Sequence, residues 1–168
     1  MNDSRPQTRA KHPRSPLAGP YGHPFHPIMV TIPIGTWTAS VIFDILGLFA
    51  EDPTPYAIGA QILIAIGIIG AVVAAVFGLL DLTRLASGTP ARRTALTHMT
   101  LNLAAVVVFA IGWAVRAAQG HEEISVMGLV LSVVGLLLVG ISGWLGGKLA
   151  YRYGVRVADE QTQAEGFR

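Results

Sequence analysis

Four long apolar stretches limit what this chain can fold into more than any other feature of its sequence. Each is long enough to cross a hydrocarbon core about 30 Å thick, which takes roughly 20 helical residues at about 1.5 Å each. Because the connections are short, consecutive spans must run antiparallel as neighbours. The sequence therefore predicts an all-α, four-helix transmembrane bundle of up-down-up-down order, with spans near residues 28–50, 57–81, 95–117 and 125–150.

The composition agrees with a membrane protein. Of the 168 residues, 52% are hydrophobic and 13% are charged, and the mean hydropathy of +0.53 exceeds that of an average soluble domain. The absence of cysteine excludes disulfides, thiolate metal sites, cysteine-ligated iron–sulfur clusters and cysteine nucleophiles in this chain. No nucleophile–base constellation, phosphate-cradling glycine loop or zinc-protease motif is present, so the sequence does not favour an enzymatic role.

The basic residues predict the orientation of the bundle. Every lysine and arginine except Arg116 lies before span one, between spans two and three, or at and after the end of span four. The other two connections, "EDPTP" and "AQGHEE", are acidic. The positive-inside rule then places both termini in the cytoplasm. The net charge of +2 follows from this topology, without a nucleic-acid partner.

Polar segments are expected on both sides of the four-span domain, which we place at residues 22–157. Residues 1–21 are basic and rich in proline, which predicts a disordered tail, and residues 158–168 form a polar C-terminal tail. A signal peptide is not expected, because the first apolar stretch begins too late and runs too long.

Small residues at four-residue spacing predict close helix packing. Gly70, Ala74 and Gly78 follow this pattern in span two, and Gly143 and Gly147 follow it in span four. We assign these residues to packing and to no chemistry.

Two charged residues of opposite sign are expected near the outer membrane boundary. Asp44 shares a helix face with Trp37 and Ser40 and reaches the depth expected for Arg116. Each charge would be costly alone in lipid, so the sequence predicts a buried ion pair, Asp44 with Arg116, of mainly structural value.

A second polar group is expected at the cytoplasmic boundary. His26 lies at the start of span one, Asp81 at the end of span two and His98 at the start of span three, so the three side chains share one depth. Asn102, four residues after His98 on the same helix face, extends the group about 6 Å deeper.

Prolines constrain the first part of this group, the motif "HPFHP". The residue before a proline disfavours the helical region, so His23 and His26 are expected in extended or turn conformation. Pro27 suits the first helical position, with His26 as the cap. Pro33 lacks the N–H that would bond to Met29, which predicts a kink.

Three uses fit the histidine–aspartate group. The histidines can cap helices and bond to one another. They can instead hold haem or a divalent metal through His26 or His23 together with His98, with Asp81 as a further ligand or orienting group and Asn102 in support. They can also relay protons, because histidine titrates near neutral pH. His12 and His121 are expected to be ordinary solvent-exposed residues.

The motifs "HPFHP", "GLLDLTRL", "THMTLN" and "GGKLAYRYGVRV", together with Asp44, resemble the bacterial membrane proteins called domain of unknown function 2231. The resemblance covers roughly residues 22–157. It implies a four-span protein without an assigned activity, multi-pass in the bacterial inner (cytoplasmic) membrane. Some members are joined to a Rieske-type domain, which implies a membrane redox partner of that type. The motif residues carried over are His23, His26, Asp44, Asp81, His98 and Asn102.

These observations favour a non-enzymatic structural or assembly subunit in the lipid bilayer. The alternative is a small membrane redox subunit that binds haem b or a metal through the histidines. A proton or solute transporter ranks lowest, because few polar residues lie between the two polar groups. The sequence leaves the cofactor, the partner and any homo-oligomer open.

Overall fold

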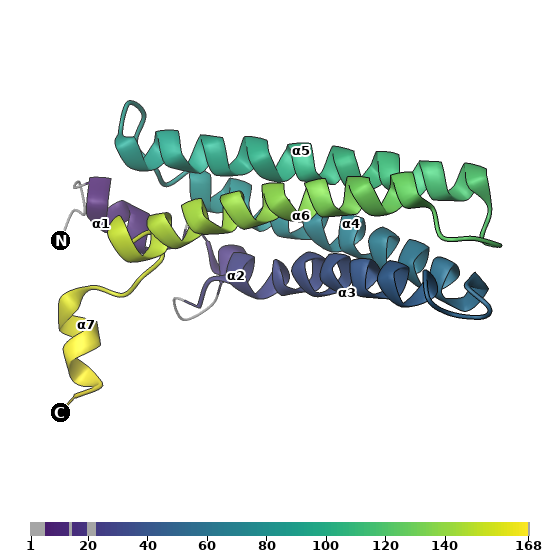
Figure 1. Ribbon diagram of the computed structural model, residues 1–168. Coiled ribbons are helices and arrows are strands. Elements are labelled where there is room, and N and C mark those ends of the chain that lie inside the picture. The colour runs from purple at the N-terminus through teal and green to yellow at the C-terminus, as the bar shows by residue number, and fades with distance from the viewer. Residues whose placement is uncertain (1–5, 14, 20–22, 168) are drawn as a thin grey trace.

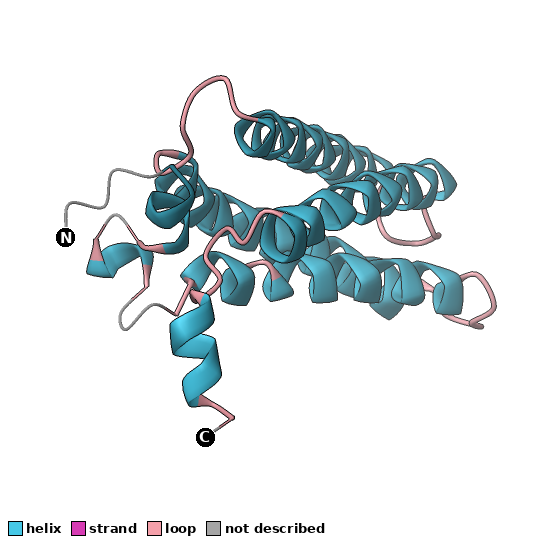
Figure 2. Cartoon of the chain, turned by 90° about the vertical axis from the view of Figure 1, so that its left-hand side faces the viewer, coloured by secondary structure: helices cyan, strands magenta, loops and turns pink. Residues whose placement is uncertain are grey.

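Four long helices form the body of the computed structural model, which describes residues 6–13, 15–19 and 23–167 (Figure 1). The long helices are α3 (Thr31–Gly47), α4 (Thr54–Leu82), α5 (Pro90–Gln119) and α6 (Val126–Gly147). Short elements flank them: α1 (Pro6–Lys11), η1 (Pro16–Ala18), α2 (Phe25–Met29), the π-helical turn η3 (Lys148–Arg152) and α7 (Glu160–Glu165). The described residues contain helices and loops only (Figure 2), so the predicted all-α class is confirmed.

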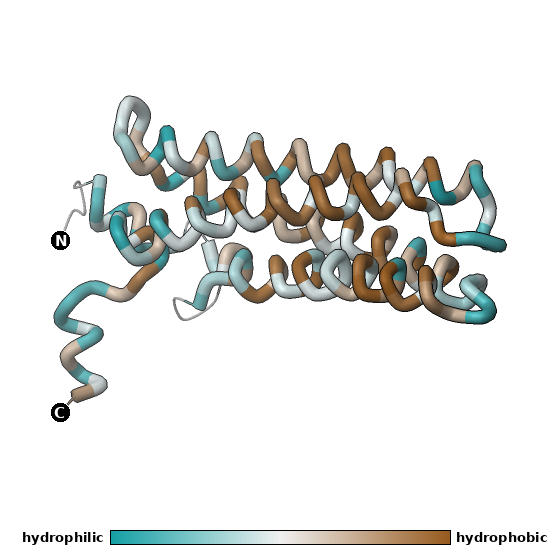
Figure 3. Tube along the Cα trace, viewed as in Figure 1, coloured by the Kyte–Doolittle hydropathy of each residue, from teal (hydrophilic) through white to brown (hydrophobic). Residues whose placement is uncertain are grey.

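Four segments are long and apolar enough to cross a membrane, as the sequence predicts. They are Phe25–Gly47, Thr54–Leu82, Pro90–Gln119 and Val126–Arg152. Figure 3 shows apolar residues along the middle of the long helices and polar residues towards the ends. Many of the isoleucines and valines are exposed, whereas glycine, alanine and serine are prominent among the buried residues. Helices that turn large apolar side chains outward are suited to lipid as solvent.

The two ends of the bundle differ in charge. The first, which we call the basic end, holds α1, the α4–α5 connection, η3 and α7, and carries the described lysines and arginines other than Arg116. The opposite, acidic end holds the α3–α4 and α5–α6 connections with Glu51, Asp52, Glu122 and Glu123. That the basic end faces the cytoplasm stays a prediction from the positive-inside rule.

The first span is interrupted near its start. Helix α2 ends at Met29 and α3 begins at Thr31, because Pro33 has no N–H for the Met29 carbonyl and its ring crowds that carbonyl. His26 lies within α2, which Pro24 caps, so the expectation that His26 itself is a non-helical cap was wrong. Pro27 falls in the first turn, where its missing N–H would have had no helical partner.

Part of the N-terminal segment is folded, in contrast to the disorder expected for residues 1–21. Ala10 of α1 and Ala18 of η1 are buried, and the Ala10 carbonyl accepts a hydrogen bond from the Arg156 N–H at 3.0 Å. Arg84 Nε also donates to the Arg9 carbonyl at 3.2 Å. Residues 1–5, 14 and 20–22 lie outside the described part of the chain. The described N-terminal residues therefore pack against the basic end.

Small residues behave differently in the two spans where they were expected to pack. Gly70 and Ala74 of α4 are buried, as close packing requires. In α6, by contrast, an added Cβ at Gly143 would meet nothing within 4 Å, so this glycine faces outward. The buried small residues of α6 are instead Gly128, Ser132, Gly135 and Ser142.

The helices associate as two hairpins, since α3 packs mainly on α4 and α5 packs mainly on α6. Between the hairpins, the rings of Trp37 and Phe109 stack at 4.1 Å with an interplanar angle of 11°. Ile64 is fully buried beside them, and its carbonyl accepts from Trp37 Nε1 at 3.3 Å. The stacked rings fill the middle of the bundle and separate the polar groups at its two ends.

Candidate functional site

His26 projects from α2 towards α4 at the basic end. Its Nδ1 lies 2.9 Å from the Ala74 carbonyl, and its ring lies against Gly78, where an added Cβ would be 3.1 Å away. Because a carbonyl can only accept, Nδ1 carries the proton of the neutral ring and Nε2 carries a lone pair. No described residue forms a hydrogen bond with this Nε2.

His98 occupies a matching place on α5. Its Nδ1 lies 2.7 Å from the Ser142 carbonyl, which again places the proton on Nδ1. The Ser142 hydroxyl donates to the His98 carbonyl at 3.0 Å, and the Asn102 amide donates to His98 Nε2 at 3.2 Å and to the same carbonyl at 3.0 Å. His98 is therefore held more tightly than His26.

The two imidazoles face each other across the bundle. Their ring centres are 6.1 Å apart and their planes meet at 80°. An added Cβ at Gly146 would lie 3.3 Å from the His98 ring, just as one at Gly78 would approach the His26 ring. Both rings thus lie beside glycines, which leave room for close approach.

The correspondence between the two histidines extends over both hairpins. Buried positions in α3 match buried positions in α5 at one constant spacing along the chain. Buried positions in α4 match buried positions in α6 at a second constant spacing. The α3–α5 pairs are Pro33 with Ala105, Trp37 with Phe109, Ser40 with Gly112 and Asp44 with Arg116; the α4–α6 pairs are Ala60 with Gly128, Ile64 with Ser132, Gly67 with Gly135 and Ala74 with Ser142. The contacts recur as well, because Gly67 lies against Trp37 as Gly135 lies against Phe109.

If a symmetry axis relates the two hairpins, corresponding residues that contact one another must lie next to that axis. Three such pairs meet between the hairpins: His26 with His98, Trp37 with Phe109, and Asp44 with Arg116. The two hairpins are therefore related by a two-fold axis that runs along the bundle, with α3 opposite α5 and α4 opposite α6 (Figure 1). Few of the matched residues are identical, which hides the repeat in the sequence.

The structure brings Asp44 and Arg116 together near the acidic end. Arg116 Nη2 donates to Asp44 Oδ2 and to Ser132 Oγ at 3.1 Å, and Nη1 donates to the Gly112 carbonyl at 3.2 Å. Their side chains are only 1% and 3% exposed, so this is a fully buried ion pair. An added Cβ at Gly128 would lie 2.6 Å from Arg116 Nη1, which explains why glycine is needed there.

Asp81 is not arranged with the histidines as a third ligand. Its Oδ1 lies 3.1 Å from Arg156 Nε. Among the described residues, no group of three or more histidine or acidic side chains is placed to hold a metal ion. His23 is exposed and precedes α2. The structure thus brings together His26, His98 and Asn102, and leaves His23 and Asp81 outside the pair.

Three residues of these clusters were not predicted from the sequence. Ser142 and Ser132 look like ordinary small residues of a packed helix, and Arg156 looks like one of several basic residues after the last span. Of the remaining histidines, His12 is exposed as expected, whereas His121 is half-buried and in contact with Gln61 through Nε2 and Oε1.

The family comparison agrees with this architecture. The family described as "Predicted membrane protein (DUF2231)" matches residues 22–159. The chain belongs to this family. The family resemblance seen in the sequence motifs is thereby confirmed, and the chain is a multi-pass membrane protein with four membrane-length helices. Neither a curated protein nor a solved structure matches the chain.

Proposed function

We propose that the chain is a small membrane redox subunit that binds haem between His26 and His98. The observation that carries the proposal is the shared hydrogen-bonding pattern of the two rings. Each Nδ1–H donates to a main-chain carbonyl of the neighbouring helix, at 2.9 Å for His26 and 2.7 Å for His98. Metal-ligating histidines almost always donate their second ring N–H in this way, which fixes the tautomer and leaves Nε2 as the ligand.

Haem fits this donor set better than a bare divalent metal does. A bare metal needs three or four protein ligands, and the described residues offer no such group around the histidines. Haem iron needs only two axial ligands, because the macrocycle supplies the other four nitrogens. Haem held by His26 and His98 would supply one-electron transfer between ferric and ferrous iron.

Two local changes would admit the macrocycle. The Asn102 amide must leave His98 Nε2, and it retains the His98 carbonyl as an acceptor at 3.0 Å. The hairpins must also separate at the basic end to make room for the macrocycle. Each hairpin packs mainly on itself, and Gly78 and Gly146, which have no side chains, flank the rings.

The proposed setting is the bacterial inner membrane, with the basic end in the cytoplasm and a redox partner such as a Rieske-type protein. The positive-inside distribution supports this orientation. A transport pathway gains no support, because the Trp37–Phe109 stack fills the middle of the bundle.

A structural or assembly subunit is the second candidate. The observation in its favour is that both ring nitrogens of His98 already have partners, so that the residue ties α5 to α6 without any ligand. Under this candidate, the histidines fix helix positions and the protein purifies without colour.

Absorption spectra of the purified protein distinguish the two candidates. The protein is isolated in detergent from haem-replete cells, and oxidised and dithionite-reduced spectra are recorded for the wild type and for His26→Ala and His98→Ala. We expect a Soret band in the wild type that is lost or shifted in both variants. His121→Ala and His23→Ala serve as matched controls and should keep the wild-type spectrum.

A colourless, metal-free wild type would sink the haem proposal and favour the structural candidate. In that case, His98→Ala should lower the yield of folded protein, measured by size-exclusion chromatography and far-UV circular dichroism. A coloured wild type whose spectrum survives both histidine changes would also refute the proposed ligands.

A further inference from the structure

Arg156 is a buried arginine beside the histidine pair that the function proposed above does not use. It follows the last span, and its backbone adopts a φ of 59°, which is unusual for a residue other than glycine. Its side chain is only 5% exposed. Such a backbone conformation persists only when the surrounding structure imposes it, so the packing of the basic end determines the position of Arg156.

One guanidinium nitrogen has a hydrogen-bond partner, and a second contacts a carboxylate without forming a hydrogen bond. Nη2 donates to the Ala18 carbonyl at 3.0 Å, and Nε lies 3.1 Å from Asp81 Oδ1. Neither Nε nor Nη1 forms a hydrogen bond with a described residue, although both atoms are buried. A buried charged donor without an acceptor is costly, so Nη1 points to an acceptor supplied from outside these residues.

The arginine lies close to His26. The His26 ring packs on Gly78, and Asp81 follows three residues later, on the same side of α4. Arg156 contacts this aspartate, so its guanidinium lies about one helical turn from the ring. Asp81 is a counter-charge to the guanidinium at Nε, and Nη1 is left without an acceptor among the described residues.

We propose that Arg156 Nη1 binds a carboxylate of the haem held by His26 and His98, namely one of its propionate groups. The inference rests on the proposed function, since it assigns the acid group of the same ligand. A guanidinium is the side chain best suited to hold a carboxylate in a buried place, because its fixed donors match the two oxygens. A phosphate group of an anionic lipid offers the same chemistry, and the experiment separates the two sources.

The test compares two forms of the ligand in two proteins. Wild type and Arg156→Gln are prepared without haem and titrated in detergent with haemin and with haemin dimethyl ester, whose propionates carry no charge. We expect Arg156→Gln to weaken haemin binding by roughly tenfold to a hundredfold, the size of a lost hydrogen bond between charged groups. With the ester, both proteins should bind equally and weakly.

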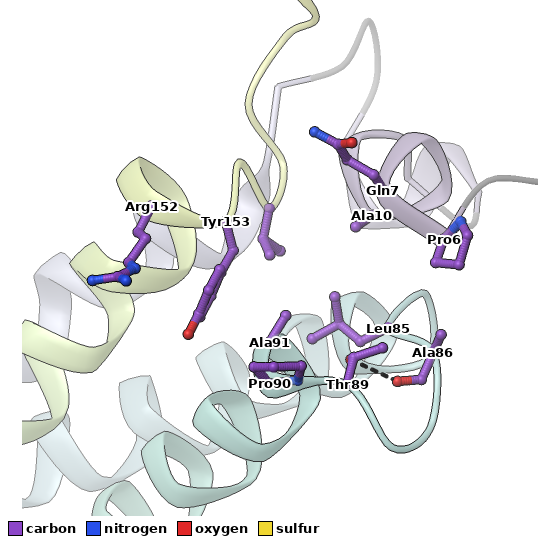
Figure 4. A pocket seen from close by; sticks show the side chains of 11 residues that line it. Pro6, Gln7, Ala10, Leu85, Ala86, Thr89, Pro90, Ala91, Arg152 and Tyr153 are labelled. Carbon is purple, nitrogen blue, oxygen red and sulfur yellow. Dashed lines mark hydrogen bonds between the residues drawn. The ribbon is translucent and has the colours of Figure 1, made fainter.

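Arg152→Gln is the matched control, because this arginine is exposed and lies four residues earlier. Figure 4 shows its side chain turned away from Gln7, across the pocket of about 380 Å³ that lies between α1 and the segment after α6. This variant should bind both ligands as the wild type does. Arg156→Lys provides a second reading if Arg156→Gln folds poorly, and it should bind haemin with intermediate affinity because it retains the charge but lacks the planar donors.

The outcomes separate this inference from the function on which it rests. If the wild type binds neither ligand, the proposed function fails and the inference fails with it. If the wild type binds haemin through both histidines but Arg156→Gln binds it equally well, only the inference fails. If Arg156→Gln loses co-purified anionic lipid, measured as phosphorus, while haemin binding is unchanged, a lipid phosphate is the partner and the propionate assignment is overturned.

Discussion

Replacing Arg116 by methionine should destabilise the protein by about 3–5 kcal/mol, because the change leaves Asp44 buried without a counter-charge. The aspartate side chain is 1% exposed, and Arg116 is the only described residue that donates to its carboxylate. The protein can limit the penalty by protonating this carboxyl. From an ordinary aspartate pKa of 3.8, protonation at pH 7 costs about 4 kcal/mol, which agrees with the range for a broken buried pair.

Neutralising both partners should restore most of this loss. In the double variant Asp44→Asn/Arg116→Met, no charge remains in the buried site, so stability should return to within about 1–2 kcal/mol of the wild type. Equilibrium unfolding in mixed micelles, followed by far-UV circular dichroism, gives the four free energies of the cycle. If Arg116→Met alone were as stable as the double variant, the argument from an uncompensated buried charge would be refuted.

The two-fold repeat adds a sharper expectation for the charge swap Asp44→Arg/Arg116→Asp. The position that corresponds to Gly128 is Ala60, so an arginine at 44 meets a Cβ where Arg116 meets none. The swap should therefore restore less stability than the neutral double variant, and adding Ala60→Gly should recover part of the difference. Full recovery by the swap alone would contradict the packing asymmetry.

Two further changes test the packing and the acidic end. Gly67→Ala should cost about 1–3 kcal/mol, because the new Cβ would lie 2.2 Å from Nε1 of the stacked Trp37, whereas the outward-facing Gly143→Ala should be neutral or slightly stabilising; both are measured by the same unfolding assay. At the acidic end, a hydrogen bond from Thr54 lowers the pKa of Asp52 below its ordinary 3.8. The pKa of Asp52 is lower in the folded state than in the unfolded state. Its contribution to the free energy of unfolding is therefore present above pH 3.8 and is lost as the pH falls through the folded-state pKa. Asp52→Asn should reduce the loss of stability below about pH 4. If stability below about pH 4 falls equally in Asp52→Asn and in the wild type, Asp52 does not contribute to the acid dependence.

The amino-acid sequence was sufficient for the features that depend on depth in the membrane. Span length and charge placement predicted four helices and two chemically distinct ends, because each residue's depth follows from its distance to a span boundary. Depth alone also placed Asp44 level with Arg116 and His26 level with His98. In each case the cost of an isolated polar group in lipid made a partner at the same depth necessary.

Only the tertiary structure decided which helices face one another and through which side chains. The contacts that α2 and α3 make with α5 depend on a two-fold arrangement of the hairpins, and few identical residues reveal it in the sequence. Neither the His26–His98 pair nor the Trp37–Phe109 stack can therefore be predicted from periodicity. The same limit explains Gly143, which has the spacing of a packing residue and faces outward. It also explains Asp81, which shares the depth of the histidines but contacts Arg156, a residue brought inward by a backbone turn after the last span. A helical pattern specifies a face and a depth, but the partner of that face is chosen by the packing of all four helices together.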